Sequence, residues 1–167
     1  MATCPCCGKV IVPAAGPLDS DILLVGEYPG HDELRRGIPF VGEAGHILEH
    51  ELFLVGMNMR EYRLTNLWQH FKPSKMDDTS RGCLDEFVIA LTKEMRGRKV
   101  LLMGSENANL FLQWKISDCS GLLVESALFP NDVQFVQACV NPASVLHGNV
   151  GELRLAIQKF AERCGGT

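Results

Sequence analysis

Residues 21–45, DILLVGEYPGHDELRRGIPFVGEAG, decide the fold because they join a buried strand to a glycine-bracketed loop and then to a helix. The apolar run that ends at Gly26 is short, which is typical of a strand covered on both faces in an α/β sheet. Ligands of open α/β sheets bind outside the carboxyl ends of the strands. The loop residues Glu27, Tyr28 and Pro29 therefore lie where a functional site is expected.

Beyond this stretch the chain continues to alternate helices and strands. Apolar residues at helical spacing predict helices over 42–55, 79–95 and 150–163, with a further helix after Ser105 and Asn149 capping the last one. Short apolar runs predict strands at 62–68, 99–103 and 133–140, with an edge strand at 122–125. This alternation predicts an α/β fold, a three-layer sandwich with a mainly parallel sheet of four strands between helical layers.

Length and composition indicate one globular domain over 1–167. The chain has 167 residues and a 46% hydrophobic content, enough for a proper core. No apolar run approaches the roughly 20 residues that span a bilayer, and no export signal begins the chain. We therefore expect a soluble, cytoplasmic protein that does not contact membranes, and we expect a monomer. A net charge of −4 is not that of a strongly basic nucleic-acid-binding domain, although it permits local basic patches.

The glycines of the opening loop do not form a nucleotide-binding motif. GEYPG lacks the G-x-G-x-x-G order of a dinucleotide site, and the sequence contains no Walker motif. A nucleotide-binding α/β protein of unrelated function is therefore disfavoured.

The N-terminal residues 4–8, CPCCG, suggest a metal-binding knuckle. Cys4 and Cys7 are separated by two residues, a spacing in which backbone amides turn toward the thiolates. Seven cysteines are an odd number, which favours free thiols or metal ligands over disulfides. His46 and His50 lie four apart in a predicted helix, but no third ligand is in register and we interpret them as structural. A tetrahedral metal needs two more ligands. The candidates are His70 and Cys83, and the less favoured ones are Cys119, Cys139 and Cys164.

Two asparagines follow predicted strands. The amide of Asn66 offers a donor and an acceptor side by side, which suits recognition of a flat heterocycle, although an asparagine there also suits a turn cap. Residues 141–144, Asn-Pro-Ala-Ser, form a second loop at the carboxyl end of a strand. We expect both segments to lie near the opening loop.

The order of these pieces resembles a known family. GEYPG, RRGIPFVGEAG, YRLTN, KVLLMGSENA and VNPASVLHG follow one another along nearly the whole chain. They are similar to the uracil-DNA glycosylase superfamily, most closely family 4, whose members look like GEAPG, RPFVGRAG, YITN and HPA. The resemblance implies a sandwich around a four-stranded sheet, DNA as the partner, and hydrolysis of the N-glycosidic bond of a flipped nucleotide.

The resemblance also implies roles for individual residues. Phe40 matches the aromatic residue that stacks on the base, and Asn66 matches the asparagine that reads the pyrimidine edge. Glu27 occupies the family's GE position and Glu33 a second acidic position. We expect Glu33 to orient the attacking water and Glu27 to position the reacting groups, with Asn141 as the third catalytic residue.

The chain departs from the family pattern at residues that are expected to lie near the excised base. Asn141 stands where family 4 has histidine and resembles the NPS motif of mismatch-specific uracil glycosylases; it can donate a hydrogen bond but cannot become cationic. Tyr28 replaces a small residue, so we expect it to line the base site and to influence which base is admitted. Leu146 matches the residue that fills the hole left by the flipped base. The residues expected at the DNA are Gly30, Ser144, Leu146 and His147.

The resemblance changes the interpretation of the metal site. Family 4 holds an iron-sulfur cluster with four cysteines, and Cys4, Cys7 and Cys83 fit three of them, while His70 stands in the fourth place. Three thiolates and one imidazole are a common zinc set. We therefore predict structural zinc, with a [4Fe-4S] cluster as the alternative, and leave open whether Cys6 replaces Cys4 or Cys7.

These observations lead to two hypotheses for function. The first is a DNA glycosylase that leaves an abasic site. It would remove uracil in repair or, given Tyr28 and Asn141, a bulky 5-substituted pyrimidine in a phage-encoded or antiphage defence context. The second is a catalytically inactive member of the superfamily that only binds DNA or a protein.

Overall fold

The four main apolar runs predicted as strands form one parallel sheet. The computed structural model describes residues 1–148 and 150–165. The strands are β1 (Ile22–Gly26), β2 (Arg63–Asn66), β3 (Lys99–Met103) and β4 (Phe135–Cys139), in the order β2-β1-β3-β4. Gly26 pairs with Asn66, and Met103 with Cys139. The carboxyl ends of all four strands therefore meet at one edge of the sheet.

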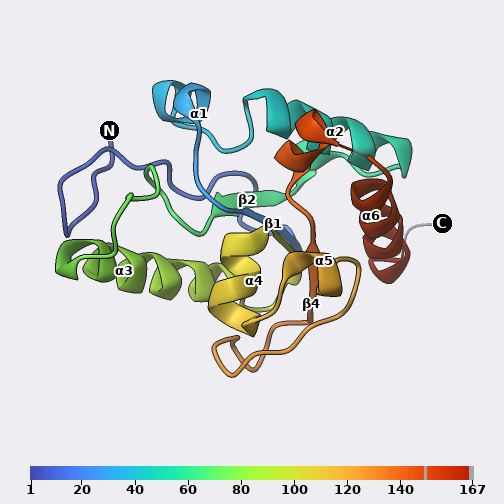
Figure 1. Ribbon diagram of the computed structural model, residues 1–167. Coiled ribbons are helices and arrows are strands. Elements are labelled where there is room, and N and C mark those ends of the chain that lie inside the picture. The colour runs from blue at the N-terminus through green and yellow to red at the C-terminus, as the bar shows by residue number, and fades with distance from the viewer. Residues whose placement is uncertain (149, 166–167) are drawn as a thin grey trace.

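Helices cover both faces of this sheet (Figure 1). The described α-helices are α1 (His31–Arg36), α2 (Glu43–Leu54), α3 (Asp78–Met95), α4 (Ser105–Leu112), α5 (Ile116–Cys119) and α6 (Gly151–Arg163). Two 3₁₀ helices are η1 (Met59–Glu61) and η2 (Pro142–His147).

The core is divided by the sheet into two clusters. Successive side chains of a strand point to opposite faces, so Leu23 and Val25 of β1 pack with α3 and α4, whereas Ile22 and Leu24 pack with α2 and α6. At roughly 25 cal/mol per Å² of apolar surface removed from water, this double burial is the main force holding the layers together. The predicted three-layer α/β sandwich is confirmed, and every strand pairing is parallel.

The structure differs from the sequence prediction in its short elements. The six residues of α1 include none that is buried, so no apolar periodicity marks this helix. The predicted edge strand at 122–125 is reduced to a single antiparallel bridge between Leu123 and Gln137. The loop predicted after Asn141 forms η2. The predicted cap Asn149 lies outside the described residues.

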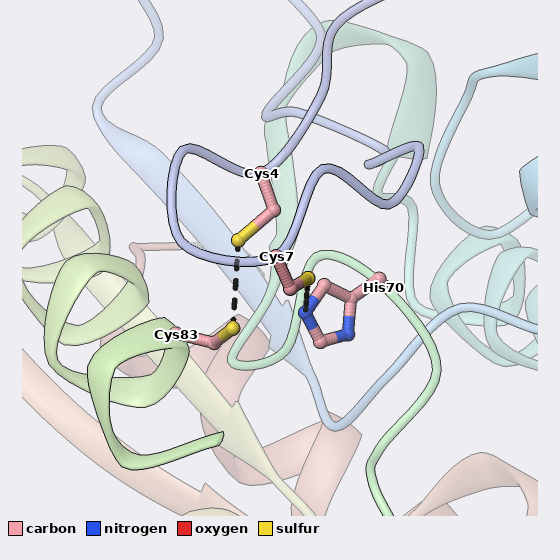
Figure 2. A group of neighbouring side chains, drawn as sticks. All are labelled: Cys4, Cys7, His70 and Cys83. Carbon is pink, nitrogen blue, oxygen red and sulfur yellow. Dashed lines mark hydrogen bonds between the residues drawn. The ribbon is translucent and has the colours of Figure 1, made fainter. Parts of the chain in front are cut away.

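The N-terminal segment is tied to the sandwich at several places. Near its start, the turn that carries Cys4 and Cys7 lies beside His70 and the first half of α3 (Figure 2). Further along, an antiparallel bridge joins Ala15 to Leu64 of β2. The segment before β1 is therefore part of the folded structure.

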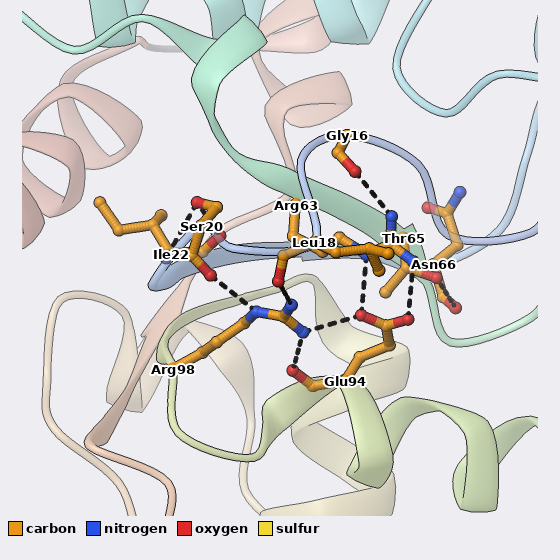
Figure 3. Close-up of polar contacts among 9 residues, drawn as sticks. All are labelled: Gly16, Leu18, Ser20, Ile22, Arg63, Thr65, Asn66, Glu94 and Arg98. Atoms are coloured by element: carbon orange, nitrogen blue, oxygen red, sulfur yellow. Dashed lines mark hydrogen bonds and ion pairs between the residues drawn. The ribbon is translucent and has the colours of Figure 1, made fainter.

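A charged network fixes the residues just before β1 (Figure 3). Both oxygens of Glu94 accept hydrogen bonds from Arg63 at 2.9 Å, and Arg98 donates to Glu94 Oε2 at 2.9 Å. The two arginines also donate to main-chain carbonyls, Arg63 to Gly16 at 2.7 Å and Arg98 to Leu18 at 2.7 Å. Burial tends to raise the pKa of Glu94, but the two arginines hold this pKa below its ordinary value.

This network gives a first prediction, for Glu94→Gln. The lowered pKa of Glu94 means that its stabilisation is present above the unfolded-state pKa and is lost as pH falls through the folded-state pKa. We expect the variant to unfold with ~1–3 kcal/mol less free energy at neutral pH, and the difference from wild type to shrink as pH falls below the ordinary range of a glutamate. Urea unfolding at a series of pH values measures this. Asp132→Asn removes an exposed partner of Arg96 and serves as the control, with a loss of about 0.5 kcal/mol or less. A pH-independent loss in Glu94→Gln would contradict the prediction.

Among the described residues, no helix has both the length and the apolar character needed to cross a membrane. The single domain, the cytoplasmic location and the monomeric state stay predictions.

Candidate functional site

A cavity of about 200 Å³ opens at the carboxyl edge of the sheet. It is built from segments far apart in the sequence: the loop after β1, the turn before α2, the end of β2 and the start of η2. Seven residues predicted from the sequence line it: Glu27, Tyr28, Gly30, Glu33, Phe40, Asn66 and Asn141. The parallel sheet brings these residues together because each lies at the carboxyl end of a strand or in the segment that follows it.

The carboxylate of Glu27 is held between two elements. Its Oε2 accepts a hydrogen bond of 3.0 Å from the backbone N–H of Glu106, in the first turn of α4, where the positive end of the helix dipole favours negative charge. Its Oε1 accepts a hydrogen bond from the side-chain amide of Asn141. Gly104, at φ +97°, makes room for this carboxylate, because a Cβ there would collide with it. These contacts fix the position of the Glu27 carboxylate in the site.

The carboxylate of Glu33 closes the loop that frames the cavity. Its Oε1 accepts from the backbone N–H of Gly30 at 2.9 Å, and its Oε2 accepts from the N–H of Val41 at 3.0 Å. Both oxygens therefore bind backbone groups on either side of α1. This contact fixes the position of the turn that carries Phe40.

Phe40 and Asn66 form the inner wall around Gly26. Phe40 has φ 58°, a left-handed conformation that costs a bulky residue of order 1–3 kcal/mol and is most often found at functional sites. A Cβ on Gly26 would collide with Oδ1 of Asn66 and would lie 3.0 Å from the Phe40 ring. The asparagine is 4% exposed, and its amide makes no hydrogen bond with any residue that the structure describes. Its donor and acceptor are therefore available to a ligand.

Asn141 retains one donor that has no partner among the residues that the structure describes. Its Oδ1 accepts from the N–H of Ala143 at 2.9 Å, which sets the orientation of the amide. Its Nδ2 carries two hydrogens, and one of them goes to Glu27. The second can reach a ligand in the cavity that both residues line.

Asn107 is a supporting residue that sequence reasoning missed. It is fully buried in α4 and donates to the carbonyls of Gly26 at 3.0 Å and Met103 at 2.9 Å. These contacts join the carboxyl ends of β1 and β3, next to Glu27. The only sequence signal is an asparagine in the first turn after the glycine that ends a strand.

Three predicted DNA contacts lie outside the cavity lining. Ser144, Leu146 and His147 are exposed on η2, whose first residues, Pro142 and Ala143, line the cavity. The structure therefore places these three residues beside the cavity mouth, on the surface.

Four side chains converge at the N-terminal turn (Figure 2). The ligand atoms of Cys4, Cys7, His70 and Cys83 lie within 4.8 Å of one another. The sulfurs of Cys4 and Cys83 are 3.5 Å apart, and Cys7 Sγ lies 3.6 Å from His70 Nε2. His70 Nδ1 is bonded to the carbonyl of Phe71 at 2.8 Å, which directs Nε2 toward the thiols, as is usual for a metal-ligating histidine. Cys6 is exposed and lies outside the group, and Cys83 is in the second turn of α3.

The environment of these thiols is asymmetric. Burial and the neighbouring thiols raise the pKa of Cys83 to about 12. Burial also acts on Cys4, but the backbone N–H groups of Cys6 and Cys7 keep its pKa below the ordinary value. Cys4 therefore loses its proton more readily than Cys83. The group is chemically able to bind a metal.

A known protein family matches the part of the chain that forms this site. A sequence model described as "Uracil DNA glycosylase superfamily" matches residues 13–161, which hold every residue of the cavity lining. The chain therefore belongs to the uracil-DNA glycosylase superfamily. A glycosylase hydrolyses N-glycosyl bonds, so both the family and the enzyme class predicted from the sequence are confirmed.

Individual relatives point to one branch of this superfamily. The type-4 uracil-DNA glycosylase of Archaeoglobus fulgidus is 29% identical over 164 residues, which cover 92% of this chain and 82% of the relative. The type-4 enzyme of Pyrobaculum aerophilum is 27% identical over 149 residues, covering 83% of this chain and 74% of the relative. The predicted resemblance to family 4 is confirmed.

Proposed function

We propose that this protein excises uracil from DNA by hydrolysis of the N-glycosidic bond and leaves an abasic site. The observation that carries the proposal is the cavity of about 200 Å³ with an unpaired asparagine amide at its inner wall. Pockets for drug-sized ligands are typically ~300–1,000 Å³, so this cavity suits a single base. The similarity to type-4 uracil-DNA glycosylases supports uracil as that base.

The walls of the cavity suit recognition of a pyrimidine. The ring of Phe40 offers a face for stacking, and the amide of Asn66 offers adjacent donor and acceptor groups to the edge of the base. A base must leave the duplex to reach them, at a cost of a few kcal/mol that these contacts recover. Leu146, exposed on η2, fills the gap in the stack. Gly30, Ser144 and His147 contact the strand.

The polar groups suit the charges that develop during bond cleavage. The base leaves as an anion and the sugar becomes cationic, so a carboxylate near the sugar and a donor near the base stabilise the transition state. We assign the first role to Glu27 and the second to the free N–H of Asn141. We also assign the orientation of the water to Glu27, rather than to Glu33, because one partner of Glu27 is the side chain of Asn141 in the cavity lining, whereas both oxygens of Glu33 bind backbone N–H groups that close the loop.

The donor set at the N-terminal turn supports zinc as the resident metal. With metal–sulfur distances near 2.3 Å, tetrahedral geometry separates two ligand sulfurs by about 3.8 Å. The group of four ligand atoms within 4.8 Å has this scale. A [4Fe-4S] cluster would need a wider arrangement, because each ligand binds a different iron. A bound zinc would hold the N-terminal turn, His70 and α3 together, and the reaction would not pass through it.

A panel of oligonucleotides tests the proposed activity. Each carries one altered base, in single- or double-stranded DNA, and alkaline cleavage reveals abasic sites. We expect cleavage at uracil. Cleavage only at bulky 5-substituted pyrimidines would instead support removal of modified bases in a phage-related context. Binding without cleavage of any substrate would support the inactive DNA-binding alternative.

A second prediction concerns Tyr28, whose side chain lines the cavity and is 49% exposed. Because its phenol ring narrows the mouth, we expect Tyr28→Ala to admit larger bases. The ratio of the excision rate of a 5-substituted uracil to that of uracil should rise about 10-fold or more. Tyr28→Phe keeps the ring and should retain the wild-type ratio. An unchanged ratio in Tyr28→Ala would mean that this residue does not select the base.

A further inference from the structure

An open hollow of about 680 Å³ adjoins the base cavity. It is lined by aromatic, apolar and cationic side chains, which we call the Phe71 platform: Tyr28, His31, Phe71, Lys72 and Met76. Tyr28 lines both the hollow and the cavity, so the two lie next to each other. Phe71 is 41% exposed and Met76 43%. The platform is thus an apolar surface open to solvent at the mouth of the base site.

The central residue of the platform, Phe71, is held at its ring and at its main chain. The ring of His31 packs edge-on against Phe71, with centroids 4.9 Å apart and planes at 69°. The carbonyl of Phe71 is bonded to His70, one of the four residues of the metal-binding group. An exposed aromatic ring that is fixed in this way has already lost the conformational entropy that binding would otherwise cost.

The charge beside the ring also suits a nucleic acid. Lys72 forms an ion pair with Glu106, and Glu106 gives its backbone N–H to the carboxylate of Glu27. Lys72, a cation of the platform, is therefore linked through Glu106 to the carboxylate of Glu27. A phosphate that competes with Glu106 for this ammonium would lie close to the base site.

We propose that the Phe71 platform stacks the unpaired base next to the nucleotide that is excised. This inference rests on the proposed function and adds a second base-binding site to it. Ring faces and a thioether stack on any base, so the contact is independent of sequence. Because Tyr28 borders both hollows, the neighbouring nucleotide lies beside the platform when the reacting base occupies the cavity. Stacking requires that neighbour to be unpaired, so the enzyme favours single-stranded or locally opened DNA.

The test compares two single-stranded substrates. Both contain one uracil, and in one of them the neighbouring nucleotide is a tetrahydrofuran abasic analogue, placed on the 5′ side or on the 3′ side in separate oligonucleotides. For the wild-type protein, removal of the neighbouring base on one side should lower kcat/KM about 10-fold or more. Phe71→Leu should lower kcat/KM on the ordinary substrate to a similar extent and should be insensitive to the missing base. Phe71→Trp, which restores a flat ring, should recover the wild-type pattern.

Controls separate stacking from a loss of structure. Phe53 is 74% exposed on α2, away from the platform, and Phe53→Leu should behave as wild type. The metal content of each variant checks that His70, whose Nδ1 contacts the carbonyl of Phe71, is still in place. An equal loss on both substrates in Phe71→Leu would assign the ring a merely structural role. If kcat/KM of the wild type does not depend on the neighbouring base, the surface would instead suit a protein partner. Either result would overturn the proposal.

Binding distinguishes failure of this inference from failure of the proposed function. If no oligonucleotide is cleaved, 2-aminopurine placed beside the uracil reports stacking by a change of fluorescence on binding. A change seen with the wild type and with Phe71→Trp, but lost in Phe71→Leu, would support the platform without catalysis. No change with any of them would overturn it.

Discussion

Replacing Glu27 with glutamine is expected to lower the single-turnover rate of uracil excision about 10²–10³-fold. The variant keeps the size of the side chain but removes the negative charge that we propose to stabilise the developing sugar cation. It also places an amide where Asn141 and the N–H of Glu106 now donate to a carboxylate, so that one donor loses its acceptor. Rapid-quench measurements with enzyme in excess isolate this chemical step.

Two matched variants show which carboxylate is responsible. Glu33→Gln retains one acceptor for the loop and should lower the rate far less, about 10-fold or less, through a loosened position of Phe40. Glu43 also lines the cavity but is exposed, and Glu43→Gln should react as wild type. A larger loss in Glu33→Gln than in Glu27→Gln would return the water-orienting role to Glu33.

Removal of the metal is expected to have the largest effect on stability. We expect one zinc ion per chain and a large fall in the free energy of unfolding after chelation. A ligand that binds only the folded state adds about 4 kcal/mol when its free concentration is 1,000 times Kd. Binding here also closes chain loops, since Cys4 and Cys83 are 79 residues apart. Elemental analysis and thermal unfolding, with and without chelator, measure both expectations.

The cysteines themselves provide the controls for this prediction. Cys7→Ser should lose the metal and the stability that depends on it, whereas Cys6→Ser should retain both, because Cys6 is exposed outside the group. A brown protein with visible iron-sulfur absorbance would contradict zinc. Equal metal content in both variants would contradict the ligand set.

Much of the fold could be predicted because the sheet leaves a strong pattern in the sequence. A strand covered on both faces, such as 22–26, must be apolar along its length. It ends at Gly26, where Asn66 and Phe40 approach the backbone too closely for a larger residue. The ends of α2 and α3 fell within a residue or two of the prediction because their buried faces repeat every three or four residues. Where burial is absent, as in α1, this signal vanishes.

The positions of the site residues were predictable, but their contacts were not. Family motifs identified Glu27, Glu33 and Asn141, and strand ends indicated that they would gather at one edge. The pairing of Glu27 with Asn141 spans 114 residues and depends on how η2 folds back. The bonds of Glu33 to backbone N–H groups depend on a helix that no apolar pattern marks. Both sets of polar contacts depend on the three-dimensional arrangement of the loops, which leaves no periodic pattern in the sequence.

The spacing of the metal-binding group also bears on how the protein is made. The chain leaves the ribosome from its N-terminus, so Cys4 and Cys7 emerge first and His70 follows 63 residues after Cys7. Cys83 appears only when α3 has begun. Cys4 and Cys7 are therefore made before the two residues that complete the group, and their thiols lack these partners until then. The four residues can therefore gather only after α3 has begun to emerge.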